Sequence, residues 1–165
     1  MPDRRPNILF LLSDQHRFDC LGVNGHPQVA TPALDTLAAA GVNFTHAFTP
    51  APICVPTRCS LLTGAWPWRH GTVMNFDGES YRPLDDTLPV YPHLLREVGY
   101  ITAHVGRWHV KPGSSPLNFG YDTHLPGGGS EEPKVEGGYD YWRAKQGLPA
   151  RPEPGFFGEK DPYIS

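Results

Sequence analysis

Hydrophobic and polar positions in the first third of the chain follow the patterns of alternating strands and helices. An unbroken apolar run within residues 6–13, bounded by polar residues and too short for an isolated helix, predicts a buried strand. Thr31 and Pro32 then predict the start of a helix, with threonine as the N-cap and proline in the first turn, and Gly41 predicts its end. Residues 42–48 alternate in polarity, so we expect a second strand or extended segment there.

The middle of the chain continues this order of elements. A short helix is predicted over 57–62 and another over 87–98, each followed by a glycine that ends it. Pro92 leaves the start of the second helix open, because proline disrupts a helix interior. Residues 101–105 predict a second buried strand. Strand, helix, strand, helix, helix and strand in succession favour an α/β fold with a mostly parallel sheet flanked by helices.

The pattern changes beyond residue 112. Nineteen prolines and eighteen glycines make up about a fifth of the 165 residues and crowd toward the C-terminal half. No periodic segment is recognisable through residue 165, and such a stretch is long for a normal connection. We therefore expect residues 113–165 to be a Gly/Pro-rich loop or insertion of the same domain as residues 1–112.

Composition and charge narrow the functional classes. The hydrophobic content of 39% is that of a globular protein, and a net charge of −3 argues against nucleic-acid binding. The apolar run at 8–12 is far shorter than the ~20 residues of a membrane helix and lacks a cleavage site, so we expect neither a membrane span nor a secretory signal. Three cysteines cannot form a complete disulfide framework, which favours a reducing, cytoplasmic setting.

The candidate chemistry begins at Cys54. It stands just before a turn that Pro56 initiates, and Arg58 follows one helical turn later. A helix N-terminus favours an anion, so this position suits a reactive side chain acting on an anionic substrate. For an isolated cysteine, a buried structural role is the commoner alternative, and a nucleophilic thiolate is the generic functional one.

The residues around Cys54 indicate a more specific role for it. The run Cys54-Val55-Pro56-Thr57-Arg58, with Leu62-Thr63-Gly64, resembles the extended signature of the sulfatase family, in the alkaline-phosphatase-like superfamily. Three further blocks are similar to that family, in the family's order: Pro6 to Phe10 with Ser13-Asp14-Gln15, Thr31 to Phe44, and Gly99 to His109. The resemblance implies an alkaline-phosphatase-like sulfatase core, of which residues 1–112 would be the N-terminal part.

The resemblance also implies roles for individual residues. Cys54 would be oxidised by the formylglycine-generating enzyme to formylglycine, which serves as nucleophile and metal ligand. Asp14 would be a ligand of a divalent metal, most commonly Ca²⁺. Arg58 would stabilise the hydrated aldehyde, and Arg107 and His109 would contact the sulfate ester. One aldehyde hydroxyl would attack sulfur and release the alcohol, and the second would then expel sulfate.

The donor chemistry agrees with these roles. A hard cation prefers oxygen ligands, so a thiol beside a carboxylate suits Ca²⁺ poorly, whereas a hydrated aldehyde supplies oxygen. Each residue also has a structural alternative: Asp14 as a strand-end cap, Arg58 as a solvated helix charge, and His109 as a packed histidine. His70 could approach the site or be purely structural.

Several positions depart from the family pattern. Ser13 stands where many sulfatases have a second acidic residue, which resembles the branch of choline-sulfatase-like enzymes and phosphonate monoester hydrolases. Thr57 replaces a commoner serine, and Arg107 replaces lysine. The family's downstream Asp-Asn or Asp-His metal-ligand pair does not occur, so we expect the N-terminal portion of a larger enzyme or a truncated product.

These features lead to one main hypothesis and two alternatives. The main hypothesis is a sulfuric ester hydrolase acting on a small-molecule or carbohydrate sulfate ester. The first alternative is a phosphonate monoester or phosphodiester hydrolase of the same superfamily, and the second is a non-catalytic sulfatase remnant. The sequence does not indicate the physiological substrate or the oligomeric state.

Overall fold

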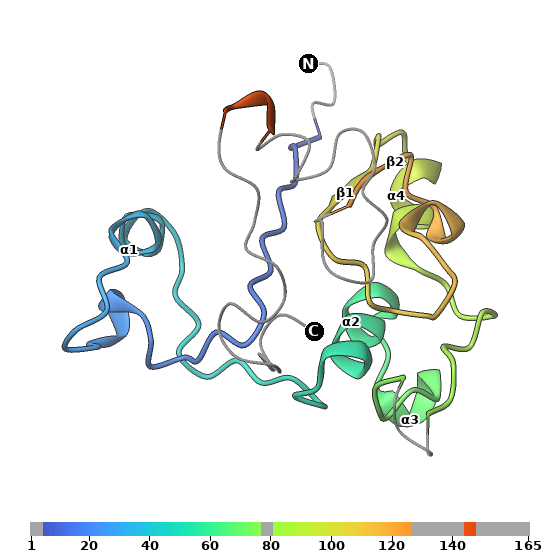
Figure 1. Cartoon of the computed structure of the whole chain (residues 1–165), viewed down its shortest axis with the longest axis horizontal. Coiled ribbons are helices and arrows are strands. Elements are labelled where there is room, and N and C mark those ends of the chain that lie inside the picture. Colours follow the sequence, from blue (N-terminus) through green and yellow to red (C-terminus); the bar gives the residue numbers. More distant parts are fainter. Residues whose placement is uncertain (1–4, 77–80, 127–143, 148–165) are drawn as a thin grey trace. The chain divides into compact units, whose positions relative to one another are not determined.

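The computed structural model describes residues 5–76, 81–126 and 144–147 (Figure 1). The chain divides into two compact units, residues 1–48 and residues 49–165, and each is described by itself. Helices accompany a small parallel sheet in the second unit, which agrees with the predicted α/β class. The predicted division at residue 112 stays a prediction.

The first unit is built around the helix α1 (Pro32–Ala40) and the 3-10 turn η1 (Gly22–Asn24). The predicted helix start and the glycine at its end are confirmed. The hydroxyl of Thr31 does not cap α1, however, because it accepts a hydrogen bond from the Gly22 N–H and donates one to Asp35 Oδ1, both at 2.8 Å. Asp35 Oδ1 also accepts a hydrogen bond from the Val23 N–H at 2.8 Å. Thr31 and Asp35 thus join η1 to α1.

The strand predicted over 6–13 is wrong, and residues 42–48, for which we predicted a strand or an extended segment, are not a strand. Residues 6–13 and 42–48 form neither strand nor helix, and their apolar side chains are exposed: Leu9 exposes 82% of its surface and Phe44 75%. A strand requires a hydrogen-bonded neighbour, and within the described part of this unit no second strand pairs with either segment. Apolar character alone therefore did not determine the backbone structure here.

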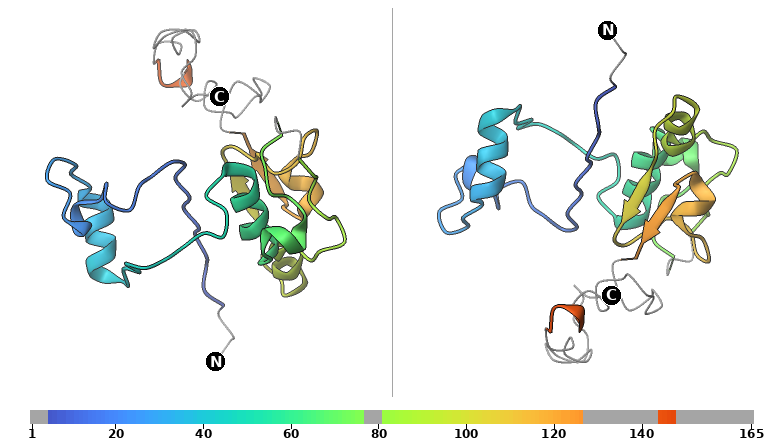
Figure 2. Two further views of the ribbon diagram at one scale, coloured as in Figure 1. Left: turned by 90° about the horizontal axis from the view of Figure 1, so that it is seen from below. Right: turned by 90° about the horizontal axis from the view of Figure 1, so that it is seen from above.

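The second unit holds the remaining elements, which are α2 (Cys54–Thr63), α3 (Pro67–His70), α4 (Tyr91–Glu97), β1 (Ala103–Val105), η2 (Pro116–Phe119) and β2 (Thr123–Leu125). Strands β1 and β2 run parallel and lie side by side, with His104 opposite His124 (Figure 2). The predicted strand over 101–105 is confirmed only in its last three residues, and it is not fully buried because Ala103 and Val105 are exposed.

The predicted helices of this unit are present with different bounds. Helix α2 begins at Cys54, three residues before the predicted start, and ends at Gly64, whose φ of 68° is left-handed. Helix α4 is confined to 91–97 because Pro92 lies in its first turn, where a missing N–H is tolerated. The segments η2 and β2 fall beyond residue 112, where we predicted no regular element. Each has only three or four residues, too few to show a period.

Helix α2 lies at the centre of the hydrophobic core of the second unit. It contacts both α3 and α4 and buries Val55, Cys59 and Leu62. The residues that follow β1 complete the same core through Trp108 and Val110, together with Leu84, Val90, Phe119 and Tyr121. The helix that begins at Cys54 is therefore held by packing along one whole side. Among the described residues, no helix has both the length and the apolar character needed to cross a bilayer.

Candidate active site

Cys54 is the first residue of α2, and the chain enters the helix in an extended conformation at Ile53. The first intrahelical hydrogen bond runs from the Thr57 N–H to the Ile53 carbonyl at 3.0 Å. Pro56 fits the first turn because an N–H at this position would have no partner within the helix. The Cys54 side chain is half-buried, unlike its buried neighbours Val55 and Pro56. A half-exposed side chain is thus held at the positive end of a ten-residue helix.

Arg58 connects this helix end to the turn that follows β1. Its Nη1 donates a hydrogen bond to the carbonyl oxygen of Arg107 at 2.9 Å, although the two residues are 49 positions apart. The Arg58 side chain is half-buried and so is more than a solvated helix charge. This bond joins α2 to the Arg107–His109 segment.

Arg107 and His109 contact each other within this turn. Arg107 Nη2 lies 3.3 Å from His109 Nε2. A guanidinium can only donate, so His109 Nε2 is the acceptor in this contact. His109 has a φ of 47°, and the turn opens at Gly106 with a φ of 104°. The unusual backbone at His109 orients an imidazole and a guanidinium toward each other.

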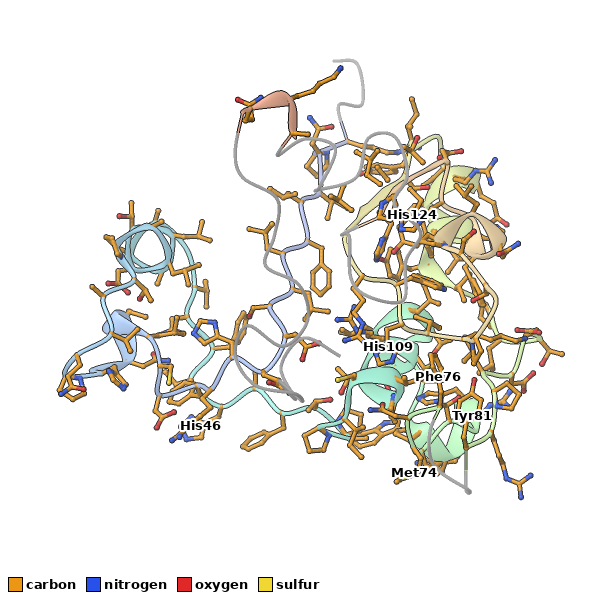
Figure 3. All side chains as sticks on the ribbon, viewed as in Figure 1. His46, Met74, Phe76, Tyr81, His109 and His124 are labelled. Carbon is orange, nitrogen blue, oxygen red and sulfur yellow. The ribbon has the colours of Figure 1, made fainter. Side chains whose placement is uncertain are left out.

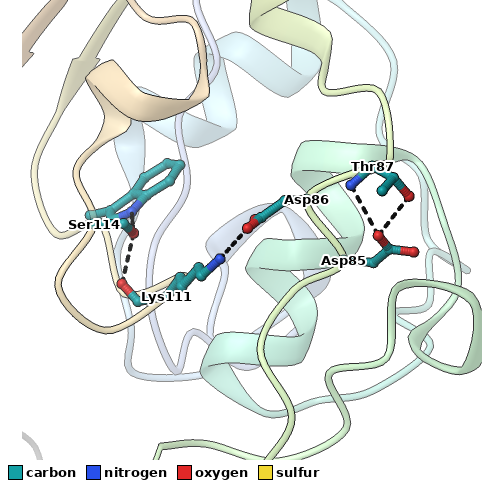
Figure 4. A network of polar contacts seen from close by, with 6 residues as sticks. Asp85, Asp86, Thr87, Lys111 and Ser114 are labelled. Atoms are coloured by element: carbon teal, nitrogen blue, oxygen red, sulfur yellow. Dashed lines mark hydrogen bonds and ion pairs between the residues drawn. The ribbon is translucent and has the colours of Figure 1, made fainter.

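The turn is anchored by the residues on either side of it. The Gly106 N–H donates to the Leu125 carbonyl at 2.8 Å and extends the β1–β2 pairing by one bond. Within the turn, the buried Trp108 donates from Nε1 to Ser114 Oγ at 3.0 Å, and Ser114 Oγ donates to the Lys111 carbonyl at 2.7 Å (Figure 4). Lys111 also forms an ion pair with Asp86, which adds little because Asp86 is 63% exposed.

Two residues of the site were missed by sequence reasoning. Asn75 Oδ1 accepts a hydrogen bond from the Val55 N–H at 3.0 Å, directly beside Cys54. Phe76 packs edge-on against the His109 imidazole, with ring centroids 4.9 Å apart (Figure 3). Neither residue lies in a recognisable motif, and only their spatial proximity to the signature helix identifies them.

Cys59 and His70 are both buried and hydrogen-bonded inside the second unit. Cys59 is fully buried, its Sγ donates to the Val110 carbonyl at 3.8 Å, and burial raises the pKa of its thiol to about 11. His70 is also fully buried; its Nδ1 accepts from the Thr72 N–H at 3.2 Å, so Nε2 donates to Ser60 Oγ at 2.9 Å. Burial lowers the pKa of His70, which agrees with a neutral ring. The structural alternative for His70 is therefore favoured.

His104 lies on β1 and is half-buried. Its ring packs edge-on against those of Trp108, Tyr121 and His124, with centroids 5.4 Å away in each case. Burial lowers the pKa of His104 to about 4, and the positive charges of His124 and Arg58 add to this effect. His104 is therefore neutral at pH 7 and adds no charge beside Arg58.

The metal site is not complete in the described residues. Asp14 lies in the first unit, in an exposed bend beside Gln15, whose φ of 52° is left-handed. Across residues 5–76, 81–126 and 144–147, no three His, Cys, Asp or Glu side chains gather where they could hold a metal ion. Calcium takes 6–8 oxygen ligands, and Asp14 and Cys54 together do not supply them. The roles predicted for both as ligands stay predictions.

Comparison with known proteins identifies the family. The family model described as Sulfatase matches residues 6–150. The chain is 36% identical over 140 residues to an ulvan-active sulfatase of Formosa agariphila, a match that covers 85% of this chain and 24% of the relative.

Two solved structures are also similar. One, a protein in complex with its substrate D-glucosamine-2-N,6-O-disulfate, has a TM-score of 0.67 and 28% identity, over 78% of this chain and 24% of the other. The other, a phosphonate monoester hydrolase of Agrobacterium radiobacter, has a TM-score of 0.66 and 28% identity, over 87% of this chain and 29% of the other. The chain spans about a quarter of the length of its curated relatives. The matched family model, the relatives and the similar solved structures agree, and the chain belongs to the sulfatase family.

Proposed function

We propose that this chain supplies the nucleophile-bearing part of a sulfuric ester hydrolase. The observation that carries the proposal is the hydrogen bond between Arg58 and the Arg107 carbonyl. It joins the helix that begins at Cys54 to the Arg107–His109 turn, which supports a shared site. Formylglycine and a divalent metal are general features of the family, and Ca²⁺ bound through Asp14 and the oxidised Cys54 is our specific proposal. No cluster of three His, Cys, Asp or Glu side chains among the described residues supplies the further ligands.

The charges and donors around Cys54 suit a sulfate ester. The positive end of the α2 dipole and the guanidinium groups of Arg58 and Arg107 all favour an anion. A guanidinium is a planar fork of donors that matches a tetrahedral oxyanion, and it keeps its charge at any physiological pH. These groups would offset the negative charge that develops on the sulfuryl oxygens during bond breaking.

Formylglycine supplies a hydrated aldehyde, with one hydroxyl to attack sulfur and a second to release sulfate afterwards. Arg58, one turn from residue 54, would hold the hydrated side chain. His109 would bind the ester through its imidazole, and Arg107 would bind the sulfuryl oxygens. Sulfated carbohydrates are the favoured substrate class, since a protein similar to this chain was solved with a sulfated glucosamine as its substrate.

Hydrolysis of an aryl sulfate by the protein, produced together with the formylglycine-generating enzyme, tests the proposal. We expect release of sulfate that Cys54→Ala abolishes and that Cys59→Ala, changing the other cysteine of α2, does not. Absence of turnover with the aldehyde in place would contradict the proposal for this chain and favour a non-catalytic remnant.

A second candidate function is phosphonate monoester hydrolysis. Its support is the similarity to the Agrobacterium radiobacter phosphonate monoester hydrolase, together with Ser13 in place of a second acidic residue. An aryl phosphonate monoester offered beside the aryl sulfate separates the two functions. A kcat/KM higher for the phosphonate would favour this second candidate.

A further inference from the structure

Asn75 satisfies a backbone group at the start of α2 that the helix itself leaves unsatisfied. The first N–H groups of any helix have no partner within it, and Ile53, at the N-cap, has no side-chain acceptor. Val55, the second residue of α2, is 0% exposed, so solvent does not reach it. Its N–H donates instead to Asn75 Oδ1 at 3.0 Å, from a residue twenty positions further along the chain. A buried donor without this acceptor would destabilise the helix end.

Phe76, the next residue, contacts His109 in the Arg107–His109 turn. Its ring meets the His109 imidazole at 4.9 Å and 85°, and it meets the Tyr81 ring at 5.2 Å and 78° (Figure 3). Such edge-to-face pairs stabilise one ring orientation. The His109 ring is therefore set from two directions, by Phe76 and by Arg107 Nη2 at 3.3 Å.

We propose that Asn75 and Phe76 are a pair of positioning residues for the reaction. Asn75 fixes the backbone beside Cys54, Phe76 fixes the imidazole of His109, and one peptide bond joins the two. The segment thereby sets the position of the nucleophile relative to the imidazole, a separation on which the reaction rate depends. The inference rests on the proposed function, because only then do both groups act on one substrate.

Hydrogen exchange at the Val55 amide, measured by NMR in the full chain, tests the role of Asn75. Asn75→Ala leaves a buried donor unsatisfied, so we expect exchange to become faster by roughly tenfold to a hundredfold. Asn75→Asp keeps an acceptor oxygen and is expected to restore slow exchange. Asn118→Ala is the matched control, because Asn118 accepts from the Ser115 N–H at 2.8 Å in η2 and leaves Val55 untouched. Unchanged exchange in Asn75→Ala, or no rescue by Asn75→Asp, would overturn this role.

The role of Phe76 is tested by the NMR signals of the His109 ring and by kinetics. Phe76→Leu removes the ring, so we expect the His109 ring-proton shifts to change and kcat to fall roughly tenfold with KM little altered. Phe76→Tyr keeps the aromatic ring, so we expect it to retain the wild-type His109 ring-proton shifts and the wild-type kcat. Unchanged His109 shifts in Phe76→Leu, or equal losses in both variants, would refute the role. The mass of the Cys54 peptide is recorded for every variant, so that failure of oxidation is distinguished from failure of positioning.

Discussion

Alkylation of the two cysteines of α2 tests how this helix is packed, since Cys54 and Cys59 lie on it in different environments. Cys59 is 0% exposed, and burial raises the pKa of its thiol from 9.0 to about 11. Only the thiolate reacts, and each pKa unit lowers its population tenfold, so at pH 8 Cys59 has about 100-fold less thiolate than an ordinary cysteine. Burial also keeps an alkylating reagent from reaching the Cys59 thiol. Cys54 is half-buried at the helix end and has no such block.

The assay uses unoxidised protein, iodoacetamide at pH 8 and mass spectrometry over time. Trypsin cleaves after Arg58 and so places Cys54 and Cys59 on separate peptides. Cys20 and Cys54 share the peptide 18–58, so fragment-ion masses assign the label to one or the other. Cys20, half-buried in the first unit, is the internal comparison for a thiol that is not fully buried. We expect Cys59 to react at least about 100-fold more slowly than an ordinary cysteine, and well after both Cys20 and Cys54. Equal rates for Cys59 and Cys20 would refute the packing of α2 that places Cys54 in the site.

Three further predictions concern stability. Arg58→Ala removes the hydrogen bond to the Arg107 carbonyl and should lower the free energy of unfolding by about 1.5–3 kcal/mol, measured by urea denaturation. The pKa of His104 in the folded protein is about 4, below its ordinary value of 6.5, so between these two pH values the unfolded chain binds more protons than the folded one. The free energy of unfolding should therefore fall as the pH drops from about 6.5 to about 4. The loss should be on the order of 2 kcal/mol after discounting for partial exposure, and a His104→Phe variant that keeps the full pH dependence would contradict it. Gly106→Ala should lower the free energy of unfolding by about 1–2 kcal/mol through backbone strain alone, because φ is 104° and no atom lies within 4 Å of the added carbon. A melting temperature equal to that of the wild type would disprove this.

Local signals in the sequence predicted the helices well. Pro32 and Gly41 mark the ends of α1, and Gly64 marks the end of α2, because proline and glycine act through their own backbone preferences. The same signals do not give the start of α2 at Cys54. That start depends on a distant acceptor, the side chain of Asn75.

Strands depend on partners that a local pattern cannot show. The apolar run at 6–13 has the composition of a buried strand, yet it is exposed in the structure and pairs with no described strand. Conversely, β2 was missed because three residues carry no period, although it pairs with β1 over its whole length. The predicted site residues Arg58, Arg107 and His109 do lie together. Asn75 and Phe76, which contact the same site, became visible only through their long-range contacts.

The mass of the tryptic peptide that carries Cys54 tests the central claim most directly. The protein is produced together with the formylglycine-generating enzyme, and the peptide that ends at Arg58 is compared with the peptide that begins at Cys59. The first peptide, residues 18–58, carries both Cys20 and Cys54, so fragment-ion masses are needed to assign each cysteine. We predict that Cys54 loses its thiol and that this peptide reacts with an aldehyde-specific hydrazide, while Cys20 and Cys59 keep unmodified thiols. An intact thiol at Cys54 would contradict the assignment of this residue as the precursor of the catalytic aldehyde.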